Sequence, residues 1–188
     1  MNPTETPSPI RDKERTRRAI LEAAQQTFTE QGAAASLAEI AYAAGITKSG
    51  LMHHFSSREA LIHAVAQYVV DRAWDEVHAH IDLSENRPGK FTRGYIRAMT
   101  GGSDFITRLL NPTSLMGSTV ITAELDDIYQ RDAQRLNDAF AADGLPHARS
   151  LAIRFAAEGL TTAIGGPYLT AADLELAREE LIGLTEMP

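Results

Sequence analysis

The chain has 188 residues, of which 44% are apolar and 23% charged, with a net charge of −7 at pH 7, and this balance is that of an ordinary globular protein. The absence of cysteine excludes disulfides, cysteine-ligated zinc and a cysteine nucleophile; it fits a reducing compartment, so we expect a cytoplasmic protein. No apolar run approaches the roughly 18 to 20 residues of a membrane span, so we expect no membrane partner.

The N-terminal part of the chain is predicted to begin with a tail and two helices. Residues 1–10 are rich in Pro, Thr and Ser and are expected to be disordered. From Ile20 onward, apolar residues recur with a helical period, and Gly32 is expected to end this helix. Ser36 and Glu39 form a capping-box pattern, which predicts a second helix that stops at Gly45.

Two further helices follow closely. Thr47 is expected to cap a third, short helix over residues 48–54. A second capping-box pattern at Ser56 and Glu59, with Ser56 as the cap, predicts the start of a long fourth helix that ends near Ile81.

The remainder of the chain also has only helical patterns. The predicted helices, separated by Gly- and Pro-containing connectors, cover residues 91–99, 104–110, 113–142 (with a possible break near Gly117 or Thr122), 147–164 and 171–184. The sequence therefore predicts an all-α fold of about nine helices. We expect a three-helix DNA-binding domain of the helix-turn-helix type over 11–57 and a helical ligand-binding and dimerisation domain over 58–188.

The second and third helices have the spacing of a helix-turn-helix, because they meet at a glycine turn, Ala44-Gly45-Ile46. The third helix begins with small or polar residues, which allow close approach to a DNA groove: Thr47, Lys48, Ser49 and Gly50. Its apolar positions, which would hold the angle between the helices, are Ile46, Leu51 and Phe55.

Charge is distributed unevenly along the chain. Residues 11–60 carry seven Lys/Arg and six Asp/Glu side chains, a net charge of +1, whereas residues 61–188 carry eleven and eighteen, a net charge of −7. The basic residues at the front gather in Arg11, Lys13, Arg15, Arg17 and Arg18. This asymmetry indicates a phosphate-facing N-terminal part and an acidic body.

A longer ungapped pattern covers about a quarter of the chain. It consists of Gly32, Ser36, Ile40-Ala41, Ala44-Gly45-Ile46-Thr47, Leu51-Met52-His53-His54-Phe55 and Ser57-Arg58-Glu59-Ala60-Leu61. In these positions the sequence resembles the TetR family of transcriptional regulators. The family usually has Tyr where this chain has Met52. Since a thioether cannot replace a hydroxyl as a hydrogen-bond donor, we expect no phosphate contact from Met52.

The resemblance implies roles in binding double-stranded DNA for matching positions. Residues facing the groove would be Lys48, Ser49, Gly50 and His53. Residues contacting phosphate would be Ser36, Thr47, His54 and Arg58. Residues reaching the flanking backbone would be Arg15, Arg17 and Arg18. It also implies a repressor that a small-molecule effector releases, and a homodimer that reads a palindromic operator.

The effector pocket and the dimer interface are predicted only from residue type and helical spacing. The candidate pocket residues are Trp74, Phe91, Tyr95, Met99, Phe105, Arg108, Met116 and Phe155. The candidate interface residues, on the last two helices, are Leu151, Phe155, Gly159, Leu174, Ala177 and Leu181. For both sets, packing within the core of one subunit is the alternative, and a regulatory pocket has no fixed motif that would identify its ligand.

Two other functions are compatible with an all-α fold. An all-α enzyme would need a nucleophile–base pair, a metal motif or a phosphate loop, and the sequence has none of these patterns. A helical protein-interaction module without DNA binding is favoured by Met52 and by the acidic total charge, but Lys48 and Arg58 argue against it. No cofactor or metal is expected, because His53 and His54, as neighbours on a helix, point about 100° apart.

Overall fold

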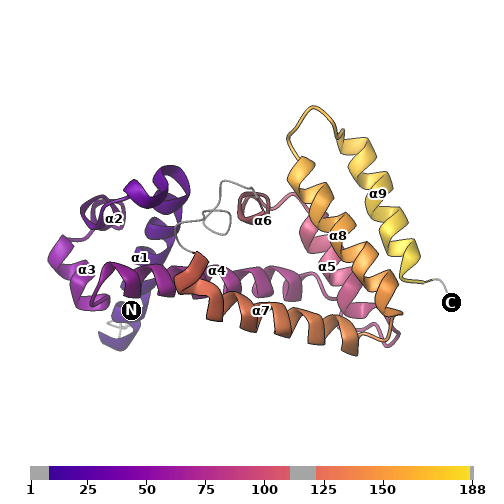
Figure 1. Ribbon diagram of the computed structural model, residues 1–188, viewed down its shortest axis with the longest axis horizontal. Helices are drawn as coiled ribbons and strands as arrows, with labels where there is room; N and C mark the ends of the chain where they lie inside the picture. Colours follow the sequence, from indigo (N-terminus) through magenta and orange to yellow (C-terminus); the bar gives the residue numbers. More distant parts are fainter. Residues whose placement is uncertain (1–8, 111–121, 187–188) are drawn as a thin grey trace, which may run out of the picture. The chain divides into compact units, whose positions relative to one another are not determined.

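The computed structural model describes residues 9–110 and 122–186 (Figure 1). Within these ranges the chain is helical, with no strand, which confirms the all-α prediction. The helices are α1 (Pro9–Gln31), α2 (Leu37–Ala43), α3 (Lys48–His54), α4 (Arg58–Ala79), α5 (Lys90–Thr100), α6 (Asp104–Leu109), α7 (Thr122–Ala142), α8 (His147–Ala163) and α9 (Ala171–Leu184), with a 3-10 turn, η1 (Gly32–Ala34), after α1. No helix in this part of the chain is long and apolar enough to cross a membrane.

Some predictions fall outside these ranges. Most of the expected tail (residues 1–8), the predicted helical stretch over 113–121 and the candidate pocket residue Met116 lie outside the described residues. The end of the expected tail is helical instead, since α1 begins at Pro9.

The chain divides into two compact units, Met1–Val69 and Val70–Pro188, which we call the headpiece and the body. The division falls inside α4, whereas the sequence pattern placed the domain boundary at 57/58, where α4 begins. A continuous helix has no loop to mark such a boundary, so helix periodicity alone does not reveal it.

The headpiece is held together by an apolar core from α1 to α4. Every apolar position predicted to face inward on α1 is buried, from Ile20 to Phe28. Its partners in the core are Ile40, Ala41, Leu51, Phe55, Leu61 and Val65. Burial of each such large apolar side chain contributes about 1.5–3 kcal/mol, so these contacts fix the angles between the short helices.

The helix starts are set by local side-chain caps. The predicted capping box of Ser36 and Glu39 is present at the start of α2, and Thr47 caps α3. The cap of α4 differs from the prediction, because the helix begins at Arg58 and it is Ser57, not Ser56, whose Oγ accepts a hydrogen bond from Ala60 N at 3.0 Å. The capping-box pattern favours Ser56, because Glu59 follows it by three residues, but the helix begins one residue later and the adjacent Ser57 is the cap.

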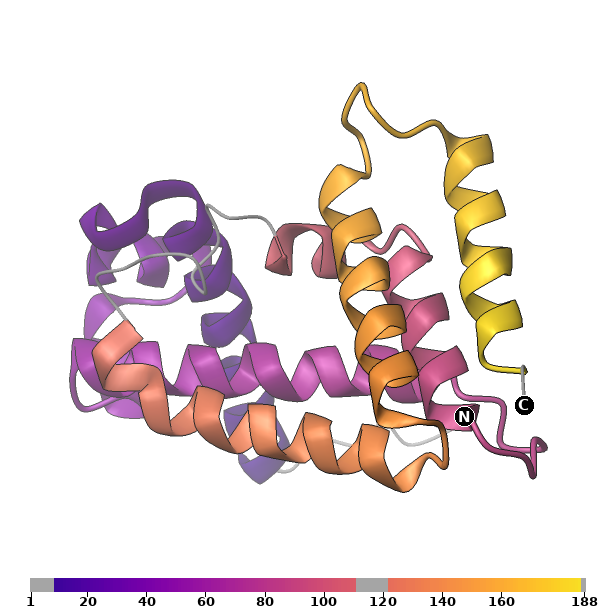
Figure 2. The same cartoon turned by 45° about the vertical axis from the view of Figure 1, so that its right-hand side comes forward.

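In the body, α5 is the central helix and packs against α8 and α9 (Figure 2). Most of its side chains are buried, including Ile96, Met99 and the charged Arg93. Asp143, at the end of α7, caps the start of α5: its carboxylate accepts hydrogen bonds from Phe91 N at 2.8 Å and Thr92 N at 2.9 Å. This cap satisfies backbone donors that the helix leaves unpaired.

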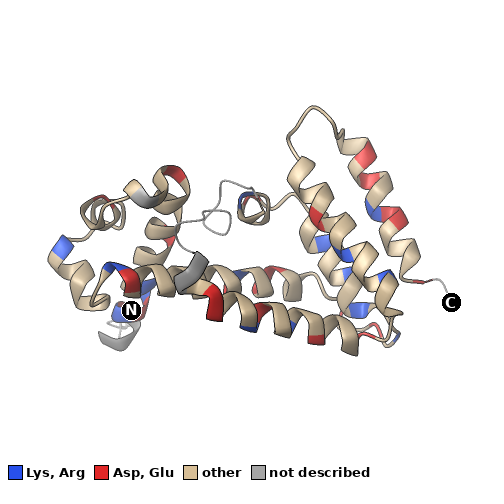
Figure 3. Cartoon of the chain, in the orientation of Figure 1, with Lys and Arg blue, Asp and Glu red and all other residues tan. Residues whose placement is uncertain are grey.

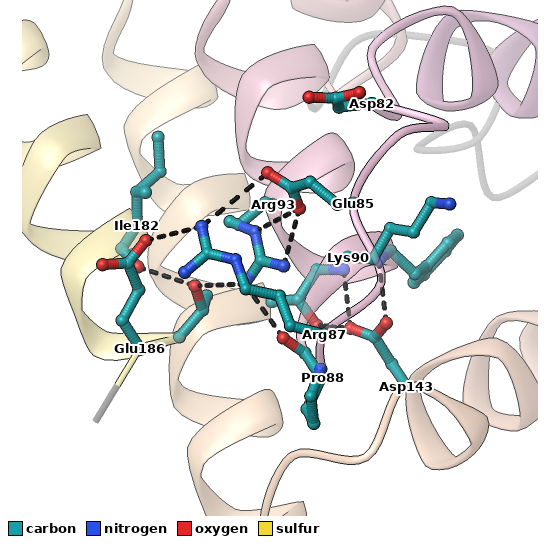
Figure 4. A network of polar contacts seen from close by, with 12 residues as sticks. Asp82, Glu85, Arg87, Pro88, Lys90, Arg93, Asp143, Ile182 and Glu186 are labelled. Atoms are coloured by element: carbon teal, nitrogen blue, oxygen red, sulfur yellow. Dashed lines mark hydrogen bonds and ion pairs between the residues drawn. The ribbon is translucent and has the colours of Figure 1, made fainter. Parts of the chain in front are cut away.

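Arg93 is fully buried and joins three segments of the body (Figure 4). Its Nε donates to Glu85 Oε2 at 2.7 Å, and its Nη2 lies 2.6 Å from the same oxygen. Nη1 donates to the Pro88 carbonyl and to Thr185 Oγ1, each at 3.0 Å. The loop before α5 is thereby tied to the end of α9, and the pKa of Glu85 is lowered, chiefly by its hydrogen bond from Arg93.

Replacing Glu85 by Gln should destabilise the body, because the buried guanidinium would lose its counter-charge; breaking a buried pair costs about 3–5 kcal/mol. Urea unfolding at pH 7 measures this loss. The folded pKa of Glu85 is below the unfolded value, so its contribution to stability is present at neutral pH and is lost as the pH falls below the ordinary value of 4.5.

The difference in the free energy of unfolding between the wild type and Glu85→Gln should therefore become smaller as the pH is lowered. Arg108→Gln is the matched control, since Arg108 is exposed and pairs with Asp104 at the surface of the body, 3.6 Å away; such a pair contributes about 0–1 kcal/mol. Equal losses from the two substitutions would contradict a special role for the buried pair.

Candidate nucleic-acid interface

The turn between α2 and α3 depends on a left-handed glycine. Gly45 has φ +71°, a conformation that residues with a Cβ rarely adopt. The following amide, Ile46 N, donates to the Ala41 carbonyl at 2.9 Å, which closes the end of α2. Thr47 then caps α3 through Gly50 N at 3.0 Å, so the second helix starts immediately after the turn.

The two sides of α3 differ sharply in exposure. Leu51 is fully buried and Phe55, directly after the helix, is 3% exposed. The residues predicted to face DNA lie on the other side: Thr47, Lys48, Ser49 and His53 are exposed, and Gly50 and His54 are half-buried. Met52 is also on the exposed side. The helix thus presents a polar, protruding surface whose angle is held by its apolar side.

Of the three arginines predicted at the front of α1, Arg17 is positioned against α3. Its guanidinium lies over the Phe55 ring, 4.3 Å from the centroid, and its Nη1 donates to the His54 carbonyl at 3.4 Å. Arg15 is exposed and pairs with Asp12 at 3.0 Å, and Arg18 is exposed. The contact of Arg17 brings a cation from α1 to the end of α3.

Ser36 and Arg58, both predicted to contact phosphate, have partners within the headpiece. Ser36 Oγ donates to Glu39 Oε2 at 2.6 Å and accepts from Glu39 N at 3.2 Å, and these hydrogen bonds lower the pKa of Glu39. Arg58 donates to the Ala35 carbonyl and lies over the Phe28 ring, 5.3 Å from its centroid. Arg58 therefore stabilises the connection between η1 and α2. Its position in the sequence did not indicate this role.

The negative charge of the chain lies in the body, as the sequence indicated: residues 9–69 sum to +1, whereas residues 70–188 sum to −7. The first turn of α3 is basic, whereas α9 carries mainly acidic side chains (Figure 3). A hollow of about 450 Å³ in the headpiece is also acidic, since Glu30 and Glu39 are among its lining residues. Its walls, from α1 and α2, are Thr27, Glu30, Gln31, Ala38, Glu39, Tyr42 and Ala43. The acidic side chains of this hollow make it a poor phosphate site.

In the body, the structure brings three candidate pocket residues together. Trp74, Phe91 and Tyr95 form one aromatic cluster with Phe140, with ring centroids 5.1 to 6.3 Å apart. Phe140 was not singled out from the sequence, although its spacing on the predicted helix is compatible with an inward position. The edge-to-face geometry of its contacts is typical of stabilising aromatic packing.

Two carboxylates adjoin this cluster. Tyr95 O–H donates to Glu158 at 2.6 Å, and Trp74 Nε1 donates to Asp132 at 2.8 Å. The pKa of Tyr95 is well above its usual value, first because of burial and then because of the Glu158 charge. Neither carboxylate was predicted, because each is brought to its partner from a distant part of the chain.

The other candidate pocket residues are spread more widely. Met99 and Phe105 are buried, and Phe105 carries the Arg72 guanidinium over its ring at 4.1 Å. Arg108 is exposed and lies 3.6 Å from Asp104 in a surface ion pair. Phe155, named for both the pocket and the interface, is 59% exposed.

The candidate interface residues divide between two environments. On α8, Leu151, Phe155 and Gly159 are exposed and follow one another every four residues, so they share a face of the helix. On α9, Leu174 and Ala177 are half-buried, but Leu181 is only 7% exposed and packs within its own subunit. Leu181 therefore offers almost no surface to a partner.

Taken together, the glycine turn, the capped third helix and its exposed polar side define a helix-turn-helix DNA-binding protein. The family model described as "Bacterial regulatory proteins, tetR family" matches residues 20–65, and the one described as "Tetracyclin repressor-like, C-terminal domain" matches residues 89–186. The chain belongs to the TetR family, and it is a DNA-binding transcriptional regulator rather than an enzyme.

Solved structures share this fold. A putative TetR-family transcriptional regulator from Rhodococcus sp. is 19% identical, with a TM-score of 0.70 over 92% of this chain and 97% of that one. The fatty acid degradation regulator FadR from Bacillus halodurans is 14% identical, with a TM-score of 0.63 over 94% and 96%. The multidrug binding protein EbrR, complexed with imidazole, is 22% identical, with a TM-score of 0.61 over 100% and 99%. None of the curated proteins matches the sequence.

Replacing Arg58 by Gln should lower the free energy of unfolding by about 1–3 kcal/mol, because the carbonyl of the buried residue Ala35 loses a charged donor and the Phe28 ring loses its cation. Chemical denaturation measures the loss. Lys48→Gln is the control; Lys48 is exposed, so its effect on stability should stay within about 0.5 kcal/mol. An Arg58 variant as stable as the Lys48 variant would contradict this stabilising role.

Proposed function

We propose that this regulator is a homodimeric repressor that binds a palindromic operator in the cytoplasm and leaves it when a small molecule occupies the body. The observation that carries DNA binding is the exposed first turn of α3, backed by the buried Leu51 and Phe55. Lys48, the one basic side chain of this turn, would reach base edges in the major groove.

The remaining contacts follow from exposure and position. Ser49, Gly50 and His53 would face the groove beside Lys48. Proposed phosphate contacts come from Thr47 and His54, from the arginines of α1 (Arg15, Arg17 and Arg18), and from Ser36 and Arg58 at helix starts. Ser36 and Arg58 already have hydrogen-bond partners in the headpiece, Glu39 and the Ala35 carbonyl. To contact a phosphate, each would have to share its hydrogen bonds or give up its partner.

The proposed dimer interface centres on the exposed face of α8. An exposed aromatic ring, Phe155, lies there between Leu151 and the small residue Gly159, which permits close approach of a second helix. A two-fold dimer places two copies of α3 on one DNA duplex, so its operator would be palindromic.

The effector would bind in the body at the aromatic cluster of Trp74, Phe91, Tyr95 and Phe140. Aromatic faces with a few polar groups, here Glu158 and Asp132, are typical of small-molecule sites. The similar fold of EbrR, a multidrug binding protein crystallised with imidazole, supports the same kind of site here. Release requires only that the effector bind the DNA-free state more tightly than the DNA-bound state.

Binding of this protein to DNA from the region upstream of its own gene should weaken steeply with salt, because phosphate contacts release counterions. Lys48→Ala should cost about 1–3 kcal/mol on the true operator and relax the preference at one base pair. Fluorescence anisotropy over a salt series measures both effects.

The control is Arg131→Ala, which removes an exposed cation of the body and should leave operator affinity nearly unchanged. If Lys48→Ala weakens binding equally on every DNA sequence, Lys48 contacts a phosphate rather than a base. No salt-dependent DNA binding at all would refute the proposal and favour a helical protein-interaction module.

Phe155→Arg should convert the dimer to monomers in sedimentation velocity, since it places a charge on the proposed interface without disturbing a buried side chain. Leu83→Arg is a suitable control, because Leu83 is also an exposed apolar residue of the body, at 83%, but lies outside α8 and α9. A dimer that survives Phe155→Arg would exclude this face of α8 as the interface.

A further inference from the structure

Three basic or titratable side chains come together where α1 lies against the end of α3. Lys13 and Arg17 are one helical turn apart on α1, and Arg17 is held at this junction by the Phe55 ring and the His54 carbonyl. His54 contributes from the last turn of α3, and the charges of Lys13 and Arg17 act on it. Lys13, which the sequence pattern did not place among the DNA contacts, therefore belongs to this basic junction.

His54 is the least solvated member of the basic junction. Its Nδ1 is buried and has no hydrogen-bond partner among the described residues. Its pKa is lowered from the ordinary 6.5, first by burial and then by the charges of Lys13, Arg17 and His53. In the free protein, then, His54 is mainly neutral at pH 7.

All the charged groups that act on His54, from α1 and from α3, are cationic. The nearby acid Asp12 is engaged with Arg15 at 3.0 Å. A site in which the charges acting on the titratable group are all cationic favours an anion. A phosphodiester suits it, because its two free oxygens can accept hydrogen bonds from a guanidinium and from an imidazole at once.

We propose that Lys13, Arg17 and His54 form a single phosphodiester site, and that binding of DNA at this site is coupled to uptake of a proton by His54. This inference rests on the proposed DNA-binding function and adds to it a residue, Lys13, and a dependence on pH.

The sign of the coupling follows from linkage. A phosphodiester beside His54 offsets the repulsion from its cationic neighbours and favours the imidazolium, so the pKa of His54 is higher in the complex than in the free protein. Between these two pKa values the complex binds more protons than its separated components. Affinity therefore rises as the pH falls through that interval, by at most about tenfold per pH unit for one proton.

The experiment measures affinity for the operator fragment by anisotropy at constant ionic strength, from about pH 5.5 to pH 8. Wild-type affinity should rise roughly three- to tenfold as the pH falls from 7.5 to 5.5, within the limit set by uptake of one proton. His54→Gln keeps a donor but cannot be protonated, so its affinity should rise less on acidification than that of the wild type. His63→Gln, an exposed histidine of the headpiece on α4, should keep the wild-type slope.

Lys13→Gln tests the new member of the site. It should weaken binding on all sequences alike and reduce the slope of log affinity against log salt by about one. The proton uptake should also fall, because one cause of the low free-state pKa of His54 has been removed.

A measurement on the wild-type protein covers the case in which a variant is misfolded. An NMR titration of the His54 ring should give a higher pKa with the operator than without it. If DNA binds but this pKa is unchanged, or if His54→Gln keeps the wild-type pH slope, the inference is overturned. If no DNA binds at any pH, it is the proposed function that fails.

Discussion

The left-handed turn at Gly45 is the constraint on which the DNA-reading surface depends. A residue with a Cβ would adopt φ +71° only at a cost of about 1–2 kcal/mol. After the turn, Thr47 caps α3, which starts at Lys48, and this start decides which side chains protrude. The same helix register directs Leu51 into the core. Because the apolar side of α3 is buried, its polar side is exposed.

Much of this headpiece could be predicted from the sequence, because its determinants are local. The helical period from Ile20, the capping box at Ser36 and the cap at Thr47 each depend on residues within a turn of one another. The cap of α4 was misassigned by one residue, because the Ser56–Glu59 pattern is that of a capping box, whereas the helix begins at Arg58 with Ser57 as its cap.

Contacts between distant parts of the chain could not be predicted in this way. Nothing within a helical turn of Arg58 indicates that it reaches the Ala35 carbonyl, and the pairing of Arg93 with Glu85 crosses a loop that the sequence marks only as a connector. The burial of Leu181 likewise depends on how α9 packs within the body. Helix periodicity identifies an apolar face, but it does not say whether that face meets the same subunit or another.

The charge of the chain illustrates why site chemistry must be assessed locally. A net charge of −7 opposes DNA binding only if it acts over long distances, yet at physiological salt electrostatic interactions between exposed groups are screened beyond about 8 Å. The relevant surroundings of a bound phosphate are therefore those of the junction of α1 and α3, where the charges that act on His54, from Lys13, Arg17 and His53, are all cationic. An acidic body and a basic contact surface are compatible for this reason, and a titratable group among the cations makes that surface responsive to pH.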